Sequence, residues 1–419
     1  MLPRLLALVA AGSSLIFVAC NRGEGGDEPS RPNRVNLLVV TVSRLDARAF
    51  DDTWREDLRA PSLDALRSRG IAFSNANALS LGTDAELATI FTGLHPRHHR
   101  SYASIYDLGE QQSTPAAKLR RIGFTTGGFT VGTPTSEQPG FREGFDVFKA
   151  PTADESIAYA RPNGDVLDAA LDWLREREDE SAAPWFCWIH VGLPNVLEDG
   201  TPLSEELASR RGLVALDEDL AELVAFVEAH APGGARQMSG SVVTAMTALR
   251  GAPGAERLPV PLRGFRVPLL FSCTEWQERK TIERAATLAD VGPALFSLLP
   301  GGSWVTRDSA PIFSDAPEEE RLIVLDRIEL GEPTATALRL GDATVGVSGI
   351  FDGLAFAGDD LALDATSEQI ERARDAYSAW SDLGSDADQG RRFELEREWL
   401  QKAKAWMREH HPELFTQGR

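Results

Sequence analysis

The chain has 419 residues, enough for one large α/β domain or for such a domain with a small annex. It carries 43 lysines and arginines against 63 aspartates and glutamates, a formal net charge of −20. No basic cluster lies outside the leader, so we predict no nucleic-acid partner. Three scattered cysteines are too few for a disulfide framework or a structural metal site. Cys187 and Cys273 lie in apolar runs and are predicted to be buried thiols.

Residues 1–19 are predicted to be a signal peptide, because Arg4 precedes an apolar run that is too short for an ordinary membrane-spanning helix. The run ends in Val18-Ala19-Cys20, which resembles a bacterial lipobox. That resemblance implies lipidation of Cys20 and a membrane anchor in the bacterial envelope. An ordinary secretory signal or an uncleaved anchor is the alternative. Residues 20–33 are predicted to be a flexible tether, and Asn21 slightly favours the outer membrane.

The apolar, β-branched run from Val35 to Ser43 predicts a strand that is buried on both faces. Helical and apolar segments alternate after it, so we expect a central strand of a helix-covered, mostly parallel sheet. In such sheets the ligand site lies beyond the carboxyl ends of the strands. This places Ser43 at the candidate site.

Next along the chain, residues 61–70 predict a helix that begins near Pro61 and stops at Gly70, followed by a strand at 71–73. A helix over 85–91 is predicted to end at Gly93. Thr83 comes at its amino terminus, where backbone N–H groups and the helix dipole favour an anion. Further helices are predicted at 166–175 and 213–227, and further strands at 185–190 and 241–245.

These elements indicate a doubly wound α/β domain over residues 34–300. The pattern changes after Pro300. Residues 301–419 are predicted to form a carboxyl-terminal subdomain with short antiparallel strands at 322–325, 336–340 and 344–347 and a terminal helix at 393–410.

Three segments in one order resemble the sulfatase family of the alkaline-phosphatase superfamily. Residues 61–66 (PSLDAL) and 70–76 (GIAFSNA) are similar to the family's P-N-L-D-x-L and G-V-x-F-x-N-A. Residues 92–96 (TGLHP) and 141–146 (FREGFD) resemble the second segment, and residues 266–271 (RVPLLF) and 289–295 (ADVGPAL) the third. The resemblance covers roughly residues 33 to 300. It implies a doubly wound fold with a small carboxyl-terminal antiparallel sheet.

The resemblance also implies a calcium or magnesium site with oxygen ligands, and here the matching positions have changed. Ser43 stands for the first metal-binding Asp, and Met246 and Thr247 stand for the later Asp-His pair. Thr83 occupies the nucleophile position, but a threonine cannot become the formylglycine that the family implies. His190 matches one histidine of an intermediate motif, in which Leu193 replaces an aspartate. Structural and functional roles are both open for His190, and equally for His95, His98, His99 and His230.

The first hypothesis is a catalytically degenerate, sulfatase-like envelope lipoprotein with a binding or accessory role and no expected cofactor. Its partners would be the membrane, through Cys20, and a sulfated or anionic glycan. The second is a divergent hydrolase of sulfate or phosphate esters that uses Thr83, with calcium or magnesium held by Asp46, Asp84 and His190. The third is a purely structural envelope protein. Fold alone does not decide among them.

Overall fold

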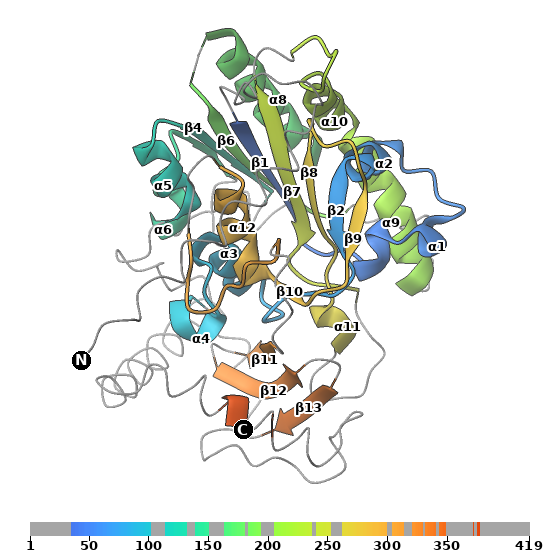
Figure 1. The fold of residues 1–419 in the computed structure, drawn as a ribbon, viewed down its shortest axis with the longest axis vertical. Helices are drawn as coiled ribbons and strands as arrows, with labels where there is room; N and C mark the ends of the chain where they lie inside the picture. The colour runs from blue at the N-terminus through green and yellow to red at the C-terminus, as the bar shows by residue number, and fades with distance from the viewer. Residues whose placement is uncertain are drawn as a thin grey trace, which may run out of the picture. The chain divides into compact units, whose positions relative to one another are not determined.

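The computed structural model describes residues 35–101, 114–131, 139–150, 163–180, 183–193, 205–236, 240–252, 262–299, 304–313, 321–329, 332–340, 343–348, 372 and 375–377 (Figure 1). The chain divides into two compact units, residues 1–256 with 261–318 and residues 319–419 with 257–260. The predicted signal peptide, the tether and the terminal helix at 393–410 lie outside the described residues. The predicted domain boundary at residue 301 stays a prediction.

The first unit is built on an eight-stranded sheet with the order β5-β4-β6-β1-β7-β8-β2-β9. β1 lies between β6 and β7 and pairs in parallel with both, whereas β8 is antiparallel to β7 and β2. The prediction of a central first strand in a mostly parallel sheet is therefore confirmed. The strands are β1 (Val35–Val42), β2 (Gly70–Phe73), β4 (Thr125–Thr130), β5 (Val147–Lys149), β6 (Trp185–Val191), β7 (Ser241–Ala248), β8 (Leu269–Cys273) and β9 (Lys280–Ile282).

Helices cover both faces of this sheet (Figure 1). What we name the α8 face carries α2 (Pro61–Ser68), α8 (Asn163–Glu180), α9 (Glu205–Asp219) and α10 (Ala221–Glu228). The opposite α3 face carries α3 (Thr83–Thr92), α5 (Pro115–Arg121), α6 (Pro139–Arg142) and α12 (Val291–Ser297). Side chains alternate along a strand, so β1 sends Val40 and Val42 to the α8 face and Leu37 and Val39 to the α3 face. Burial on both faces explains the continuous apolar run.

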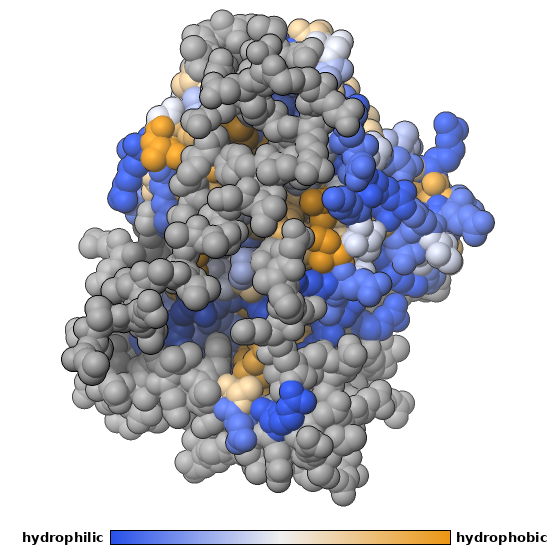
Figure 2. All heavy atoms as spheres, in the orientation of Figure 1, coloured by the Kyte–Doolittle hydropathy of each residue, from blue (hydrophilic) through white to orange (hydrophobic). Residues whose placement is uncertain are grey.

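Smaller elements join these layers. They are α1 (Asp52–Arg55), α4 (Pro96–His99), α11 (Leu262–Phe265), the 3-10 turns η2 (Ala47–Phe50) and η5 (Leu288–Asp290), and the parallel pair β3 (Ala76–Asn77) and β10 (Ala286–Thr287). Figure 2 shows largely hydrophilic described residues over α1 and α9. Among the helices of the described ranges, none has the length and apolar character needed to cross a bilayer.

Helix ends differ from prediction at two places. Gly70 does not stop α2, because that helix ends at Ser68 and Gly70 opens β2 without a left-handed backbone. The predicted helix at 213–227 is two helices that meet at Leu220. The Asp217 carboxylate, in the last turn of α9, accepts the backbone N–H groups of Ser62 (3.3 Å) and Leu63 (2.7 Å). It thereby caps α2, whose own cap residue provides no side-chain hydrogen bond.

The second unit contains a three-stranded antiparallel sheet, β11 (Leu322–Glu329), β12 (Glu332–Leu340) and β13 (Ala343–Ser348). This confirms the predicted small antiparallel sheet. The buried carboxylate of Asp326 accepts a hydrogen bond from Thr336 Oγ1 at 2.7 Å across the β11–β12 pair.

Candidate functional site

A row of polar residues crosses four neighbouring parallel strands close to their carboxyl ends. In the sheet register, Thr130 of β4 is beside His190 of β6, His190 is beside Thr41 of β1, and Thr41 is beside Thr247 of β7. All four are 0% exposed. Strand alternation places Thr41, His190 and Thr247 on the α3 face, since Val39, Trp188 and Ala245 belong to the core there. The row therefore occupies the sheet edge where ligand sites of such folds lie.

His190 is held between two hydroxyl groups. Its Nδ1 lies 2.9 Å from Thr41 Oγ1, and its Nε2 lies 3.2 Å from Ser43 Oγ. Thr41 Oγ1 also accepts the indole N–H of Trp188 at 3.0 Å. The backbone N–H of Ser43 donates to the carbonyl of Val191 at 2.9 Å, which continues the β1–β6 pairing beyond the strands. Ser43 is half-buried, so it marks the point where the buried row meets solvent.

Burial lowers the pKa of His190 to about 4, although a hydrogen bond with Thr41 opposes this. The imidazole is therefore neutral at pH 7, with one nitrogen a donor and the other an acceptor. If Nδ1 carries the proton, it donates to Thr41 and Nε2 accepts from Ser43. In the other tautomer Thr41 donates to Nδ1, and Nε2–H donates to Ser43. The Ser43 hydroxyl then donates to the carbonyl of Val191 at 3.4 Å. Both ring nitrogens are engaged in either case.

Thr83 lies at the amino terminus of α3, which begins two residues before the predicted helix at 85–91, and it is half-buried. Among the described residues, Thr83 has no hydrogen bond or ion pair with Ser43 or His190. Glu86, three residues later, lies in the first turn of the same helix. Its carboxylate turns inward and accepts the backbone N–H groups of Leu79 (3.1 Å) and Ser80 (2.5 Å). Burial raises the pKa of Glu86 to about 8, so the group is largely neutral at pH 7.

The two positions matched on β7 lie on opposite faces of the sheet. Met246 belongs to the core of the α8 face, away from Ser43 and His190. Thr247 faces the α3 side, but its hydroxyl donates to the carbonyl of Pro268 at 2.8 Å. Leu193, matched to an aspartate, packs against the core of the α8 face. Ser43, Thr41, His190 and Thr247 are thus brought to one edge, and Met246 and Leu193 are not.

Asp46 is the carboxylate nearest in sequence to Ser43, and its side chain binds Arg48. Its two oxygens accept Nε (2.9 Å) and Nη2 (2.8 Å) of Arg48, and it is 5% exposed. Burial would raise the pKa of Asp46, but the hydrogen bonds and charge of Arg48 outweigh it and hold the pKa below its usual value. Arg48 also pairs with Glu206, whose other oxygen accepts the Trp54 indole N–H. Asp46 therefore anchors η2.

The donor set at this edge does not fit the divalent ion that the fold resemblance implies. Calcium and magnesium require several hard, mostly anionic oxygen ligands. The residues in place are neutral hydroxyls and a neutral imidazole, and binding a cation would break the hydrogen bonds of His190. No group of three or more histidine, cysteine or acidic side chains suited to a metal occurs in the described part of the chain.

Two arginines beside the candidate edge were not predicted as site residues from the sequence. Arg44 follows Ser43, and Arg250 follows β7 by two residues; both are exposed. The signal was present, since each arginine comes shortly after an apolar buried strand. The sulfatase motifs show which metal-binding carboxylates are replaced, but they do not show which cationic residues lie nearby.

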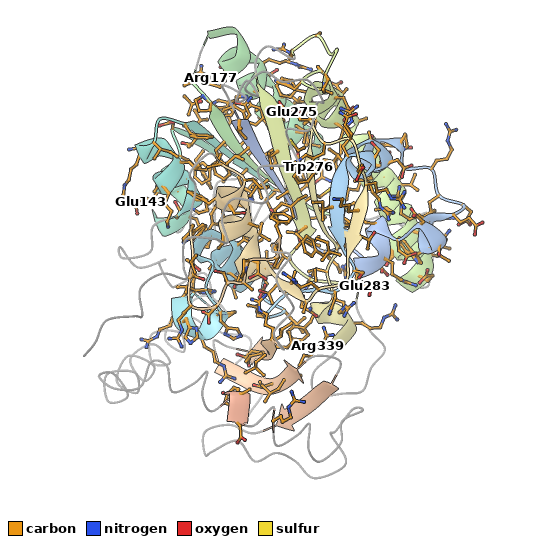
Figure 3. All side chains as sticks on the ribbon, viewed as in Figure 1. Glu143, Arg177, Glu275, Trp276, Glu283 and Arg339 are labelled. Carbon is orange, nitrogen blue, oxygen red and sulfur yellow. The ribbon has the colours of Figure 1, made fainter. Side chains whose placement is uncertain are left out.

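The remaining histidines and cysteines have structural contacts. His98 Nδ1 lies 2.5 Å from Asp308 Oδ2, and His99 Nε2 lies 3.1 Å from Thr89 Oγ1. Cys187 and Cys273 are buried free thiols, as predicted. Figure 3 labels Glu275 near the end of the sheet where β7 begins, opposite the candidate edge, and Glu275 there contacts the Ser241 hydroxyl.

Comparison with known proteins identifies the fold. No protein-family model matches the chain. A structure of a protein in the alkaline phosphatase superfamily from Vibrio parahaemolyticus matches with a TM-score of 0.59 and 16% identity, over 84% of this chain and 89% of that one. The chain has the fold of the alkaline phosphatase superfamily. BT4656 in complex with its substrate D-glucosamine-2-N,6-O-disulfate matches with a TM-score of 0.57 and 12% identity, over 91% of this chain and 99% of that one.

A sequence relative agrees with the sulfatase-like character of the fold. Choline-sulfatase of Rhizobium meliloti (strain 1021) is 31% identical over 91 residues. These make up 22% of this chain, and the chain spans only 18% of that relative's length. The predicted resemblance to sulfatases is therefore confirmed at the level of the fold.

Proposed function

We propose that this protein binds a sulfated or otherwise anionic glycan through its sulfatase-like domain and does not hydrolyse esters by the metal-dependent route. The observation that carries the proposal is that both ring nitrogens of His190 are hydrogen-bonded, one to Thr41 and the other to Ser43. Within the described part of the chain, Ser43, Thr41 and His190 are neutral hydrogen-bonding groups, and no cluster of carboxylates suited to a metal surrounds them. The sulfated substrate named for the similar structure BT4656 suggests the ligand class.

Metal content and ester hydrolysis of the full chain test the proposal. We expect no stoichiometric calcium, magnesium or zinc, no thermal shift when these ions are added, and no hydrolysis of aryl sulfates or aryl phosphates above background. Neutral dipoles alone compensate poorly for the lost hydration of a divalent cation. A tightly bound metal together with turnover that Thr83→Ala abolishes would overturn the proposal. Failure of every anionic glycan to bind would instead favour a structural role.

The Ser43–His190 contact supports a second candidate, a metal-independent hydrolase. A hydroxyl 3.2 Å from an imidazole nitrogen has the geometry of a base-assisted nucleophile. Two features make this candidate weaker. A pKa of about 4 makes His190 a poor base at neutral pH, and Thr41 supplies a neutral hydroxyl where a carboxylate would stabilise an imidazolium. Ester turnover that Ser43→Ala abolishes and Thr83→Ala preserves would establish it.

We also propose that the chain is an exported lipoprotein held in the bacterial envelope through Cys20, with the outer membrane favoured by Asn21. The support is the sequence Val18-Ala19-Cys20 after a short apolar run. Cys20→Ser should release the mature chain from membranes on fractionation, whereas Ser14→Ala within the same run should not. A Cys20→Ser variant as firmly bound as the unchanged protein would point to an uncleaved helix.

A further inference from the structure

The backbone places Arg44 and Arg250 side by side at the candidate edge. The pairing of β1 with β7 continues beyond both strands, because Leu249 N donates to Val42 O at 2.9 Å and Leu45 N donates to Arg250 O at 3.1 Å. Arg44 is therefore in the segment that hydrogen-bonds to Arg250. Ser43 precedes it directly and contacts His190. The backbones of the two arginines thus lie just beyond the carboxyl ends of β1 and β7, and Arg44 is the next residue after Ser43.

The positive charge of this pair is not neutralised by the described chain. Within the described residues, neither guanidinium has a hydrogen bond or ion pair with a carboxylate. Partial burial of the Arg250 guanidinium and the nearby charge of Arg44 lower the pKa of Arg250, although the residue as a whole is exposed. Asp46 gives both of its oxygens to Arg48. Two like charges held close together destabilise the protein unless an anion comes between them.

The surrounding groups favour an anion as well. Ser43 has a half-buried hydroxyl, and His190 beside it is neutral. Glu86 points its carboxyl at the backbone of Leu79 and Ser80 and not at solvent. The edge thus combines two cations with a neutral hydroxyl.

We propose that Arg44 and Arg250 form a metal-independent binding site for a tetrahedral oxyanion, a sulfate ester or a phosphate ester group, with Ser43 as an additional hydrogen-bonding partner. The inference rests on the proposed glycan-binding function. The guanidinium groups supply the positive charge that a metal ion supplies in the implied family site. Arginine suits this role because its planar N–H groups match the oxygens of sulfate and phosphate.

Calorimetric titration of the full chain in detergent, with EDTA present, tests the site. The probes are glucosamine-2-N,6-O-disulfate, glucosamine 6-phosphate and unmodified glucosamine. We expect an anionic probe to bind and glucosamine not to bind. Arg44→Gln and Arg250→Gln should each weaken binding by about tenfold or more, because each removes charge-assisted hydrogen bonds. Arg175→Gln, an exposed arginine on α8 that pairs with Glu222, is the charge-matched control and should bind unchanged.

The possible results separate this inference from the proposed function. If an anionic probe binds the unchanged protein, and Arg44→Gln and Arg250→Gln bind it equally well, the arginine site is wrong while glycan binding stands. If no anionic probe binds the unchanged protein, both fail. Binding only of the phosphate probe would keep the arginine site and make the ligand a phosphate ester. Binding that EDTA abolishes would contradict a metal-independent site. Thermal melting of each variant verifies that it is folded.

Discussion

Glu86 shows how a single buried carboxyl can organise the loop that leads into α3. It is 0% exposed and accepts two backbone N–H groups from Leu79 and Ser80. Burial raises its pKa from 4.5 to about 8, and the hydrogen bonds only partly oppose this. Because the folded pKa lies above the unfolded one, the folded chain binds this proton more tightly. The resulting stability is fully present below about pH 4.5 and is lost as the pH rises through about 8.

Glu86→Gln should remove that pH dependence. The amide keeps an acceptor oxygen and carries no charge, so the variant should gain stability over the unchanged protein as the pH rises from 5 to 9. The gain should be on the order of a few kcal/mol at the alkaline end. Denaturant unfolding across this range measures it. Glu56→Gln removes an exposed carboxylate and is the control. A stability difference that does not change with pH would show that Glu86 is ionised in the folded chain.

Ser43→Asp probes the electrostatics of the candidate edge. A carboxylate near His190 Nε2 should raise the pKa of His190 from about 4 by roughly 1–3 units, because an opposite charge favours the imidazolium. Ser43→Asn has nearly the same shape without the charge and should leave the pKa low. The imidazole signals in an NMR titration report both values. Equal pKa values in the two variants would contradict the Ser43–His190 contact. We expect no metal binding or ester turnover from Ser43→Asp, because its partner carboxylates are still missing.

At the scale of elements, the end of α3 depends on a glycine. Gly93 has a φ of 67°, and a Cβ there would come within 2.8 Å of Thr306 Cγ2 and 3.2 Å of Pro293 Cγ. Gly123 also has a positive φ, 97°, but a Cβ there would meet nothing within 4 Å. The two positions therefore share backbone strain and differ in crowding.

The same substitution at both glycines separates these effects. Gly93→Val should lower the free energy of unfolding by more than about 1 kcal/mol, since strain and overpacking add. Gly123→Val should cost less, because only backbone strain is involved. Thermal or denaturant unfolding of the two variants gives the difference. Equal losses of unfolding free energy would mean that Thr306 and Pro293 move aside without destabilising the protein.

Sequence patterns predicted the elements whose signals are local. The apolar run of β1 and the end of α3 at Gly93 each depend on neighbouring residues, and both are confirmed. The helix begins at Thr83, two residues before the predicted start at 85. The division of the predicted helix at 213–227 into two helices is not visible in local sequence. Asp217, near the break, accepts the backbone N–H of Leu63 at the start of α2, a contact across 154 positions of the chain. The end of β7 was placed too early, because Met246 and Thr247 continue the strand.

The candidate site could be predicted only in part, for a similar reason. Strand ends placed Ser43 and His190 at one edge, but the hydrogen bonds through Thr41 and Trp188 require the register of two strands. The inward turn of Glu86 and the nearness of Arg44 to Arg250 likewise depend on long-range packing. A one-dimensional motif records which carboxylates are missing. It does not record which charges the fold brings to the same place.

At the scale of the whole molecule, an anionic ligand meets a chain with a net charge of −20. The attraction of the two arginines is local, whereas the repulsion from the acidic surface acts over distance. The screening length falls from about 30 Å at 0.01 M salt to about 8 Å at 0.15 M. Salt should therefore remove the distant repulsion more completely than the attraction at contact.

We accordingly predict that the association rate of an anionic glycan rises when salt is increased from about 0.01 M to about 0.15 M, because the screening length shortens over this range. Dissociation should also become faster, since salt weakens the guanidinium contacts. Stopped-flow measurement with a fluorescent sulfated oligosaccharide gives both rates. Arg175→Gln should leave the salt response unchanged, while Arg44→Gln should reduce the change in dissociation. An association rate that falls steadily with salt would show that positive charge at the candidate edge dominates the approach of the ligand.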